Sequence, residues 1–280
     1  MSRPPLSKDT VLCISLAGRP SNIGTRFHNH LYDVLGLDFV YKAFTTTDIA
    51  GAIGGVRALG IRGCSVSMPF KADVLPLVDH VEPSAQVLQS VNTIVNDLTV
   101  PGGRLTASNT DYLAVQQLID DHGLDPSQSV LIRGSGGMAS AVGAAFADRG
   151  FGNGTIVARN GDAGRNLAQR LDFDYRPDTG GPCAQTADII VNVTPIGMAG
   201  GAEEHDTAFA ENAIKEARTV FDVVALPAQT PLITAAQAAG VPVITGAEVI
   251  ALQAAEQFER YTGVRPSPEQ IARASEISRA

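Results

Sequence analysis

The sequence contains no tryptophan, few aromatic residues and only three cysteines. Cys13, Cys64 and Cys183 lie far apart, and none belongs to a C-x-x-C pair. So small and scattered a set excludes a disulfide framework and a cysteine-based zinc site, and it favours a reducing compartment. The histidines also lack the spacing of metal ligands, so we expect no metal site.

Long apolar runs and basic runs are missing as well. A membrane helix needs about 20 mainly apolar residues, and the polar segment before Val11 does not resemble a signal peptide. We therefore expect a cytoplasmic protein without a membrane partner. Lysine and arginine (21) are outnumbered by aspartate and glutamate (29), which gives a net charge of −8. Without a basic surface to follow phosphates, no nucleic-acid partner is expected either.

The chain does contain enough apolar residues for a large core. Hydrophobic residues make up 44% of the 280 positions and charged residues 18%. These values exclude a disordered protein, and the length suggests about two domains. Predicted strands and helices alternate almost throughout, which is typical of an α/β fold with mostly parallel sheets.

The periodicity predicts two series of elements with a border near residue 108. In the first series we predict strands at 11–17, 39–44 and 61–67, helices at 25–35 and, capped by Thr47, from 49 to 59, and a hairpin at 91–96 and 104–107. The second series has a helix at 111–122 and strands at 129–132, 155–159, 188–193, 220–224 and 241–244. A long helix at 247–261 follows, and its position allows the last helices to pack back on the first domain.

The sharpest local motif lies at residues 134–139. Gly134, Gly136 and Ala139 fit the pattern G-x-G-x-x-G/A, after an apolar strand and before a helix. The first glycine permits a tight turn, the second lets the backbone approach a pyrophosphate, and the alanine lets the helix pack on the strand. An ordinary glycine turn is the alternative interpretation. The dinucleotide interpretation places cofactor contacts at Gly134, Ser135, Gly136, Gly137 and Met138.

The end of the next predicted strand distinguishes between the two nicotinamide cofactors. In NAD-binding proteins an acidic residue near this point holds the ribose 2′-hydroxyl. Here the strand ends in Arg159, whose guanidinium matches a 2′-phosphate. We therefore predict NADP as the cofactor; a merely solvated arginine is the alternative.

Two further ionisable residues follow predicted strands. Lys71 comes after the segment 65–70, and Asp111 begins a helix. Ligands of open α/β sheets bind beyond the carboxyl ends of strands, where a lysine can exchange a proton with a carbonyl or hydroxyl group. From the residues alone, a surface lysine and a helix-capping aspartate remain open as alternatives.

These segments together resemble the motifs of shikimate dehydrogenases. The resemblance covers roughly residues 11 to 262 and rests on the motifs Ser67-Met68-Pro69-Phe70-Lys71, Ser90-Val91-Asn92-Thr93, Asn109-Thr110-Asp111, Gly134-Ser135-Gly136-Gly137, Asn192-Val193-Thr194-Pro195-Ile196-Gly197, Asp222…Pro227…Thr230-Pro231 and Gly246…Gln253-Ala254. As a set, in this order and spacing, the motifs are highly specific, although each alone is weak.

The resemblance implies reversible, NADP-dependent hydride transfer between NADPH and the 3-keto group of 3-dehydroshikimate or a related cyclic acid. Lys71 would be the catalytic acid–base residue and Asp111 its partner. Asn92 and Gln253 would hold substrate hydroxyls, and Ser67 stands where the family usually has threonine. A small cyclic hydroxy acid is thus the implied partner, in aromatic amino acid biosynthesis.

The same resemblance implies the division of the chain. Residues 1–108 with 246–280 would form an N-terminal α/β substrate domain, residues 109–245 a Rossmann NADP-binding domain, with a closing cleft between them. Further cofactor contacts are implied at Asn192, Thr194, Val223 and Gly246. A monomer and a homodimer are both compatible with the sequence.

Two departures from the family pattern concern the substrate. The family usually carries Ser-x-Ser-Pro before His28, where the serines bind the substrate carboxylate; here those positions are Asn22, Gly24 and Thr25. A usual tyrosine is replaced by Ala225. We expect Asn22 and Thr25 to take over substrate binding. The pattern looks most like the divergent shikimate dehydrogenase-like subgroup, so a quinate or aminoshikimate dehydrogenase and a non-catalytic NADP-binding sensor stay open as alternatives.

Overall fold

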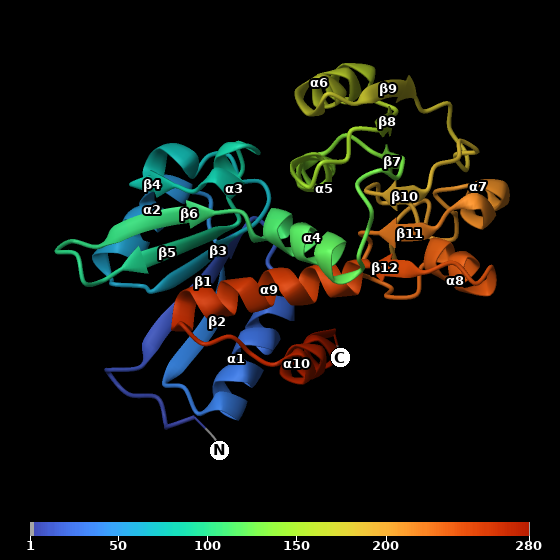
Figure 1. Ribbon diagram of the computed structural model, residues 1–280. Helices are drawn as coiled ribbons and strands as arrows, with labels where there is room; N and C mark the ends of the chain where they lie inside the picture. Colours follow the sequence, from blue (N-terminus) through green and yellow to red (C-terminus); the bar gives the residue numbers. More distant parts are fainter. Residues whose placement is uncertain (1–2, 280) are drawn as a thin grey trace. The chain divides into compact units, whose positions relative to one another are not determined.

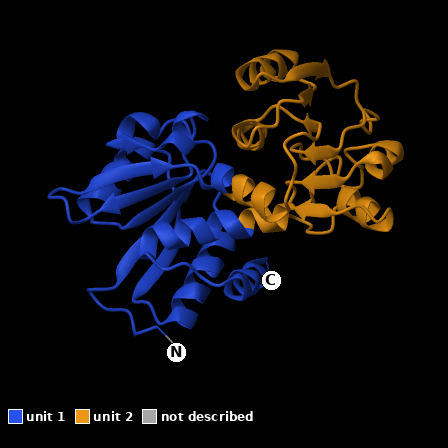
Figure 2. Ribbon diagram, viewed as in Figure 1, with its two compact units in different colours: residues 1–113, 251–280 blue, residues 114–250 orange. Residues whose placement is uncertain are grey.

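The computed structural model describes residues 3–279, which divide into two compact units (Figures 1 and 2). Unit 1 comprises residues 1–113 and 251–280, and unit 2 comprises residues 114–250. Unit 1 is thus discontinuous in sequence. The sequence suggested borders at 108 and 245, each just before a helix. The structure places them at 113 and 250, inside helices α4 (Thr110–Asp121) and α9 (Gly246–Thr262).

Unit 1 contains a six-stranded mixed sheet in the order β2-β1-β3-β5-β6-β4. Its strands are β1 (Val11–Ala17), β2 (Phe39–Thr45), β3 (Gly63–Val66), β4 (His80–Val81), β5 (Thr93–Asp97) and β6 (Arg104–Ser108). Strands β2, β1 and β3 run parallel, and the β5–β6 hairpin joins β3 antiparallel. The carboxyl ends of β1 and β3 therefore meet at one edge of the sheet.

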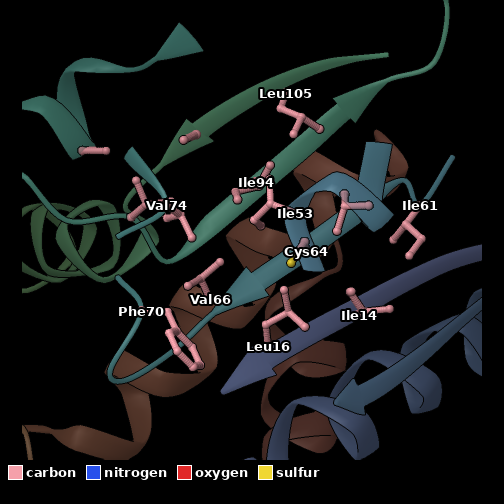
Figure 3. Packing of buried hydrophobic residues seen from close by; sticks show 14 residues of the cluster. Ile14, Leu16, Ile53, Ile61, Cys64, Val66, Phe70, Val74, Ile94 and Leu105 are labelled. Atoms are coloured by element: carbon pink, nitrogen blue, oxygen red, sulfur yellow. The ribbon is translucent and has the colours of Figure 1, made fainter. Parts of the chain in front are cut away.

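Both faces of this sheet are covered. Successive residues of β1 point to opposite sides, so Ile14 and Leu16 belong to a core cluster with Ile53 and Val56 of α2 (Ile49–Ala58), shown in Figure 3. Cys13 faces the other side, where α1 (Ile23–Leu35), α9 and α10 (Pro268–Arg279) supply the buried residues. The return of the last helices to the first domain was expected from their position in the sequence. The short helices η1 (Leu75–Leu77) and α3 (Pro83–Gln86) complete the unit.

Unit 2 is a doubly wound parallel sheet. Its strands are β7 (Val130–Arg133), β8 (Gly154–Ala158), β9 (Asp174–Pro177), β10 (Ile189–Asn192), β11 (Thr219–Asp222) and β12 (Val243–Thr245), in the order β12-β11-β10-β7-β8-β9. Its helices include α5 (Gly137–Asp148), α6 (Gly161–Leu171), α7 (Glu211–Glu216) and α8 (Pro231–Ala238). The strand order reverses between β7 and β10, and ligands of such sheets bind at this switch point. The predicted Rossmann architecture is thus present.

Several local details differ from the sequence-based expectations: β3 and β5 both begin two residues later than predicted, and the two-residue strand β4 was not predicted. Asp48, not Thr47, caps α2: its Oδ1 atom accepts a hydrogen bond from the Gly51 amide at 2.8 Å. Strand β9 was not predicted, because it is a mostly exposed edge strand without an apolar face. Among residues 3–279, no helix is long and apolar enough to cross a membrane.

Candidate functional site

The centre of the candidate site in unit 1 is an ion pair between Lys71 and Asp111. The Lys71 Nζ atom lies 2.7 Å from Asp111 Oδ2. The two side chains are 30% and 18% exposed, so the pair is partly shielded and still reachable from solvent. The two residues that the sequence suggested for proton transfer, 40 positions apart, are therefore neighbours in the fold.

Lys71 is held by the turn that follows β3. The Ser67 amide donates to Leu16 O at 2.9 Å, and the Phe70 amide donates to Ser67 O at 3.0 Å. The Lys71 carbonyl in turn accepts a hydrogen bond from the Val91 amide at 2.7 Å. This turn contains the cis Met68–Pro69 bond. The lysine backbone is thus fixed to both the strand before it and the segment before β5.

Asp111 is positioned by the start of helix α4. The Asn109 side chain caps the helix, because its Oδ1 atom accepts from the Tyr112 amide at 3.2 Å. Asn92 Oδ1 accepts from the Thr110 amide at 2.8 Å and from Thr110 Oγ1 at 3.1 Å. The buried Asn92 therefore orients the turn that carries the carboxylate, and its Nδ2 group is the part suited to a ligand.

Helix α9 brings two glutamines to the same place. Gln253 Oε1 lies 3.4 Å from Thr110 Oγ1, next to Asp111. Gln257, one turn further, donates from Nε2 to Thr93 Oγ1 at 3.0 Å and is 3.3 Å from the Asn92 carbonyl. Gln257 was not singled out from the sequence, because nothing in the helix pattern separates it from an ordinary polar residue.

The residues expected to replace the missing serines lie at the start of α1, Asn22 as its N-cap and Thr25 in its first turn. Asn22 is exposed and makes no side-chain cap. The Thr25 Oγ1 atom is buried, and residues 3–279 contain no hydrogen-bond partner for it. A Cβ atom on Gly24 would lie 3.5 Å from the Tyr41 hydroxyl. Tyr41 thus occupies the space next to the second serine position.

The glycine motif of unit 2 has the backbone geometry that its sequence predicted. Gly134 has φ +128°, and a Cβ atom there would lie 2.8 Å from Val193 Cγ2 and 3.0 Å from the Val193 carbonyl. At Gly136 and Gly137, by contrast, a Cβ atom would meet nothing within 4 Å. Helix α5 begins at Gly137 without an acidic residue in its first turn. Its first N–H groups are therefore available to an anion.

The neighbouring strand ends are joined by a buried network around Asn192. Asn192 Nδ2 donates to Asp222 Oδ1 at 3.0 Å and to Ile196 O at 3.1 Å, and its Oδ1 atom accepts from the Thr194 amide at 3.0 Å. Since both ends of the amide are used, the Asn192 side chain shapes the loop that carries Thr194. Burial raises the pKa of Asp222 to about 6, although Thr230 and Asn192 donate hydrogen bonds to it.

The remaining predicted cofactor residues lie on this edge of unit 2 as well. Val223 directly follows β11, and its amide donates to Asn192 O at 3.0 Å. A Cβ atom on Gly246 would lie 2.4 Å from the Val223 carbonyl, so only glycine permits this approach. Ser135 and Met138 are partly exposed within the glycine segment.

Arg159 is exposed directly after β8, and its guanidinium lies 3.5 Å from Glu203 Oε2. Sequence reasoning missed a second arginine, Arg133, at the end of β7. Arg133 is 1% exposed and forms a two-pronged ion pair with Asp178, with both N···O distances 3.0 Å. It also donates to the carbonyls of Gly181 and Ala208. The partners are 45 positions apart, so no local pattern reveals them.

The two units thus offer different chemistry. Unit 1 places an ammonium group against a carboxylate, surrounded by amide and hydroxyl groups. Unit 2 places a glycine turn and a helix N-terminus at the switch point of a parallel sheet, and an arginine at the end of the adjacent strand β8. No group of three or more His, Cys, Asp and Glu side chains in residues 3–279 is arranged to hold a metal ion.

Comparisons with known proteins agree with this geometry. Residues 22–94 match the family described as the shikimate dehydrogenase substrate binding domain. A shikimate dehydrogenase-like protein of Haemophilus influenzae is 56% identical over 274 residues, covering 98% of both chains. A shikimate dehydrogenase (NADP(+)) of Citrifermentans bemidjiense is 37% identical over 256 residues, covering 85% of both.

Solved structures show the same similarity. A shikimate 5-dehydrogenase-like protein superimposes with a TM-score of 0.93 at 55% identity, covering 99% of this chain and 100% of the other. The shikimate 5-dehydrogenase of Thermus thermophilus, solved with NADP(H) and shikimate, gives a TM-score of 0.83 at 26% identity, covering 96% and 99%.

Proposed function

This chain belongs to the shikimate dehydrogenase family, and we propose on that basis that it is an NADP(H)-dependent oxidoreductase. Its proposed reaction is the reversible transfer of a hydride between NADPH and the 3-keto group of 3-dehydroshikimate or a related cyclic acid. Unit 1 would hold the substrate and unit 2 the cofactor.

The observation that carries this proposal is the Lys71–Asp111 pair. Its 2.7 Å contact is maintained by three segments that are separate in the sequence: the turn after β3, the entry to β5 and the start of α4. A protein that only binds a cofactor has no need of such a pair. A positioned lysine can contribute about 10²–10⁴-fold to a proton-transfer step.

The proposed chemistry in unit 1 follows from the donors and acceptors present. Lys71 Nζ, as an ammonium group, would donate to the keto oxygen and deliver the proton of the new hydroxyl, while the hydride that reduces the carbon would come from the cofactor. In the reverse direction Lys71 takes that proton back. The Asp111 carboxylate accepts from Nζ and stabilises the charged lysine. Asn92 Nδ2 and the Gln253 amide would donate to the substrate's other hydroxyl groups.

The residues of unit 2 fit a dinucleotide. The glycine turn leaves room above Gly136 and Gly137, and the N-terminus of α5 presents free N–H groups to a pyrophosphate. Arg159 would bind the 2′-phosphate, and Thr194, Val223 and Gly246 would approach the rest of the molecule. When bound, the cofactor supplies the hydride.

The identity of the acid depends on the first turn of α1. With the two serines of the family replaced by Asn22 and Gly24, the carboxylate would be bound by Asn22, Thr25 or the neighbouring Arg26. Losing two hydrogen bonds to a charged group, at about 1.5–3 kcal/mol each, would lower affinity about 10²–10⁴-fold unless these residues compensate. Quinate and an aminoshikimate are therefore the alternative substrates.

A substrate panel tests the proposal. Purified protein would be incubated with NADP⁺ and shikimate, quinate or an aminoshikimate, and NADPH formation followed by absorbance. NADPH affinity would be measured separately by calorimetry. We expect saturable turnover of at least one acid.

The outcomes separate the alternatives. Turnover of shikimate would assign carboxylate binding to the changed residues of α1. Turnover of quinate or an aminoshikimate, but not of shikimate, would mean that the substrate pocket selects a different acid. Tight NADPH binding without turnover of any of them would contradict the proposed activity and favour a cofactor sensor.

A further inference from the structure

The loop that leaves β10 carries an acidic residue at a defined position. The Glu203 carbonyl accepts hydrogen bonds from the Gly197 amide at 2.9 Å and the Asp206 amide at 3.2 Å. Glu204 Oε2 accepts from the Gly200 amide at 2.8 Å. These contacts close the loop upon itself and fix the position of the Glu203 backbone.

The Glu203 side chain points at Arg159. Glu203 Oε2 lies 3.5 Å from the Arg159 guanidinium, and the two side chains are 36% and 55% exposed. The contact joins the loop after β10 to the end of β8. An exposed pair at this distance is weakly bound and can be exchanged for a stronger anion.

Two other aspartates of this part of unit 2 are already paired. Asp178 lies beside the end of β8, because its amide donates to the Ala158 carbonyl at 3.1 Å, but its carboxylate is held by the buried Arg133. Asp162 of α6 pairs with Arg165 at 2.8 Å. Within residues 3–279, Glu203 is thus the carboxylate that forms an ion pair with Arg159.

We propose that Glu203 is a specificity-determining residue for the cofactor, because its carboxylate competes with the 2′-phosphate of NADP(H) for Arg159. The inference rests on the proposed function, in which Arg159 binds that phosphate. A nucleotide with a 2′-phosphate must displace Glu203, whereas a nucleotide with a free 2′-hydroxyl need not. Glu203 therefore lowers the affinity for NADP(H) relative to that for NAD(H).

Binding measurements on the full chain test this competition. Dissociation constants for NADPH, NADH and 2′,5′-ADP would be measured by calorimetry for the wild type, Glu203→Gln, Arg159→Ala and the double variant. Glutamine keeps the size of the side chain and removes its charge. Glu211→Gln is the matched control, since Glu211 is an equally charged residue of unit 2 that pairs with Lys215.

We expect Glu203→Gln to tighten NADPH and 2′,5′-ADP about two- to fivefold, the range of an exposed ion pair, with NADH unchanged. The gain should disappear in the Arg159→Ala background and shrink at high salt, which screens exposed charges. Glu211→Gln should change none of the three affinities.

Three results would overturn the inference: unchanged NADPH affinity in Glu203→Gln, an equal gain for NADH, or a gain that persists without Arg159. The single variant Arg159→Ala separates this failure from that of the cofactor assignment. If Arg159→Ala weakens NADPH about tenfold or more and spares NADH, the assignment stands whatever Glu203 does. If both cofactors weaken equally, the assignment itself is wrong.

Discussion

Unit 1 builds its part of the proposed machinery from side chains, and unit 2 builds its part from backbone. In unit 1, Lys71 and Asp111 meet because the Asn92 side chain, just before β5, accepts a hydrogen bond from the Thr110 amide at the start of α4. In unit 2, the decisive features are the space above Gly136 and Gly137 and the N–H groups of the first turn of α5. The first kind of site fails when polar atoms are removed, and the glycine turn of the second fails when atoms are added.

The units also differ in how they bury ionisable groups. Unit 1 encloses His28 without charge: the ring is fully buried, stacks on Tyr41 at 4.4 Å, and has a pKa lowered to about 3 by burial. Unit 2 encloses the ion pair of Arg133 with Asp178. The buried charge of Arg133 is therefore compensated by a partner, whereas His28 avoids charge altogether.

The largest effect is expected from breaking the buried pair of unit 2. Arg133→Met leaves the buried Asp178 carboxylate without its ion-pair partner, with the Gly180 amide still bonded to it, and such a loss destabilises a protein by about 3–5 kcal/mol. Chemical denaturation would measure the change. The double variant Arg133→Met/Asp178→Leu should recover most of the loss; an equally unstable double variant would contradict the charge argument.

The second-largest effect is expected from adding one methyl group to the glycine turn of unit 2. Gly134→Ala forces a side chain into φ +128° and against Val193, a strain of about 1–3 kcal/mol. We expect both stability and NADPH affinity to fall. Gly136→Ala has open space for its Cβ atom, so it should keep the thermal stability and lose NADPH affinity alone.

If Gly136→Ala destabilises the protein as much as Gly134→Ala does, then the turn depends on more than the space around Gly134. If it binds NADPH normally, the pyrophosphate does not lie over the glycine turn. Thermal unfolding together with an NADPH titration decides between these outcomes.

Acid should affect the two units in opposite directions. The pKa of His28 falls from 6.5 to about 3 on folding. Below pH 6.5, His28 is therefore protonated in the unfolded chain but stays neutral in folded unit 1. From pH 7 to 5 this costs unit 1 about 2 kcal/mol. The pKa of Asp222 rises from 3.8 to about 6, so over the same interval unit 2 gains about 1 kcal/mol.

Native-state hydrogen exchange measures this difference, because the amides of β1 and β10 report the opening of unit 1 and unit 2 separately. His28→Gln should remove most of the pH dependence of unit 1 and leave unit 2 unchanged. A parallel loss of protection in both units between pH 7 and 5 would contradict the account.

Much of the fold could be predicted from hydrophobic periodicity. The strand at Val11–Ala17 has the predicted bounds, and the long helix α9 differs by one residue at each end. Strand β9 could not be predicted, because an exposed edge strand needs no apolar face. The cap of α2 was assigned one residue too early because threonine and aspartate are both good caps, and only the backbone decides between Thr47 and Asp48.

Candidate site residues could be proposed from local sequence at the glycine turn, because the backbone conformation there restricts which residue types fit. In unit 1 they could be proposed only through the set of family motifs, since the contact between Lys71 and Asp111 spans 40 positions. The supporting roles of Gln257 and Arg133 could not be predicted. Their partners are distant in sequence, and a buried arginine is indistinguishable from an exposed one until the fold is known.

The central claim is that Lys71, held by Asp111, exchanges a proton with the substrate while unit 2 binds the cofactor independently. The most direct test compares Lys71→Ala with the wild type on the best acid of the panel, together with NADPH affinity. The account predicts that turnover falls about 10²–10⁴-fold while the NADPH dissociation constant stays the same. Unchanged turnover in Lys71→Ala would contradict it.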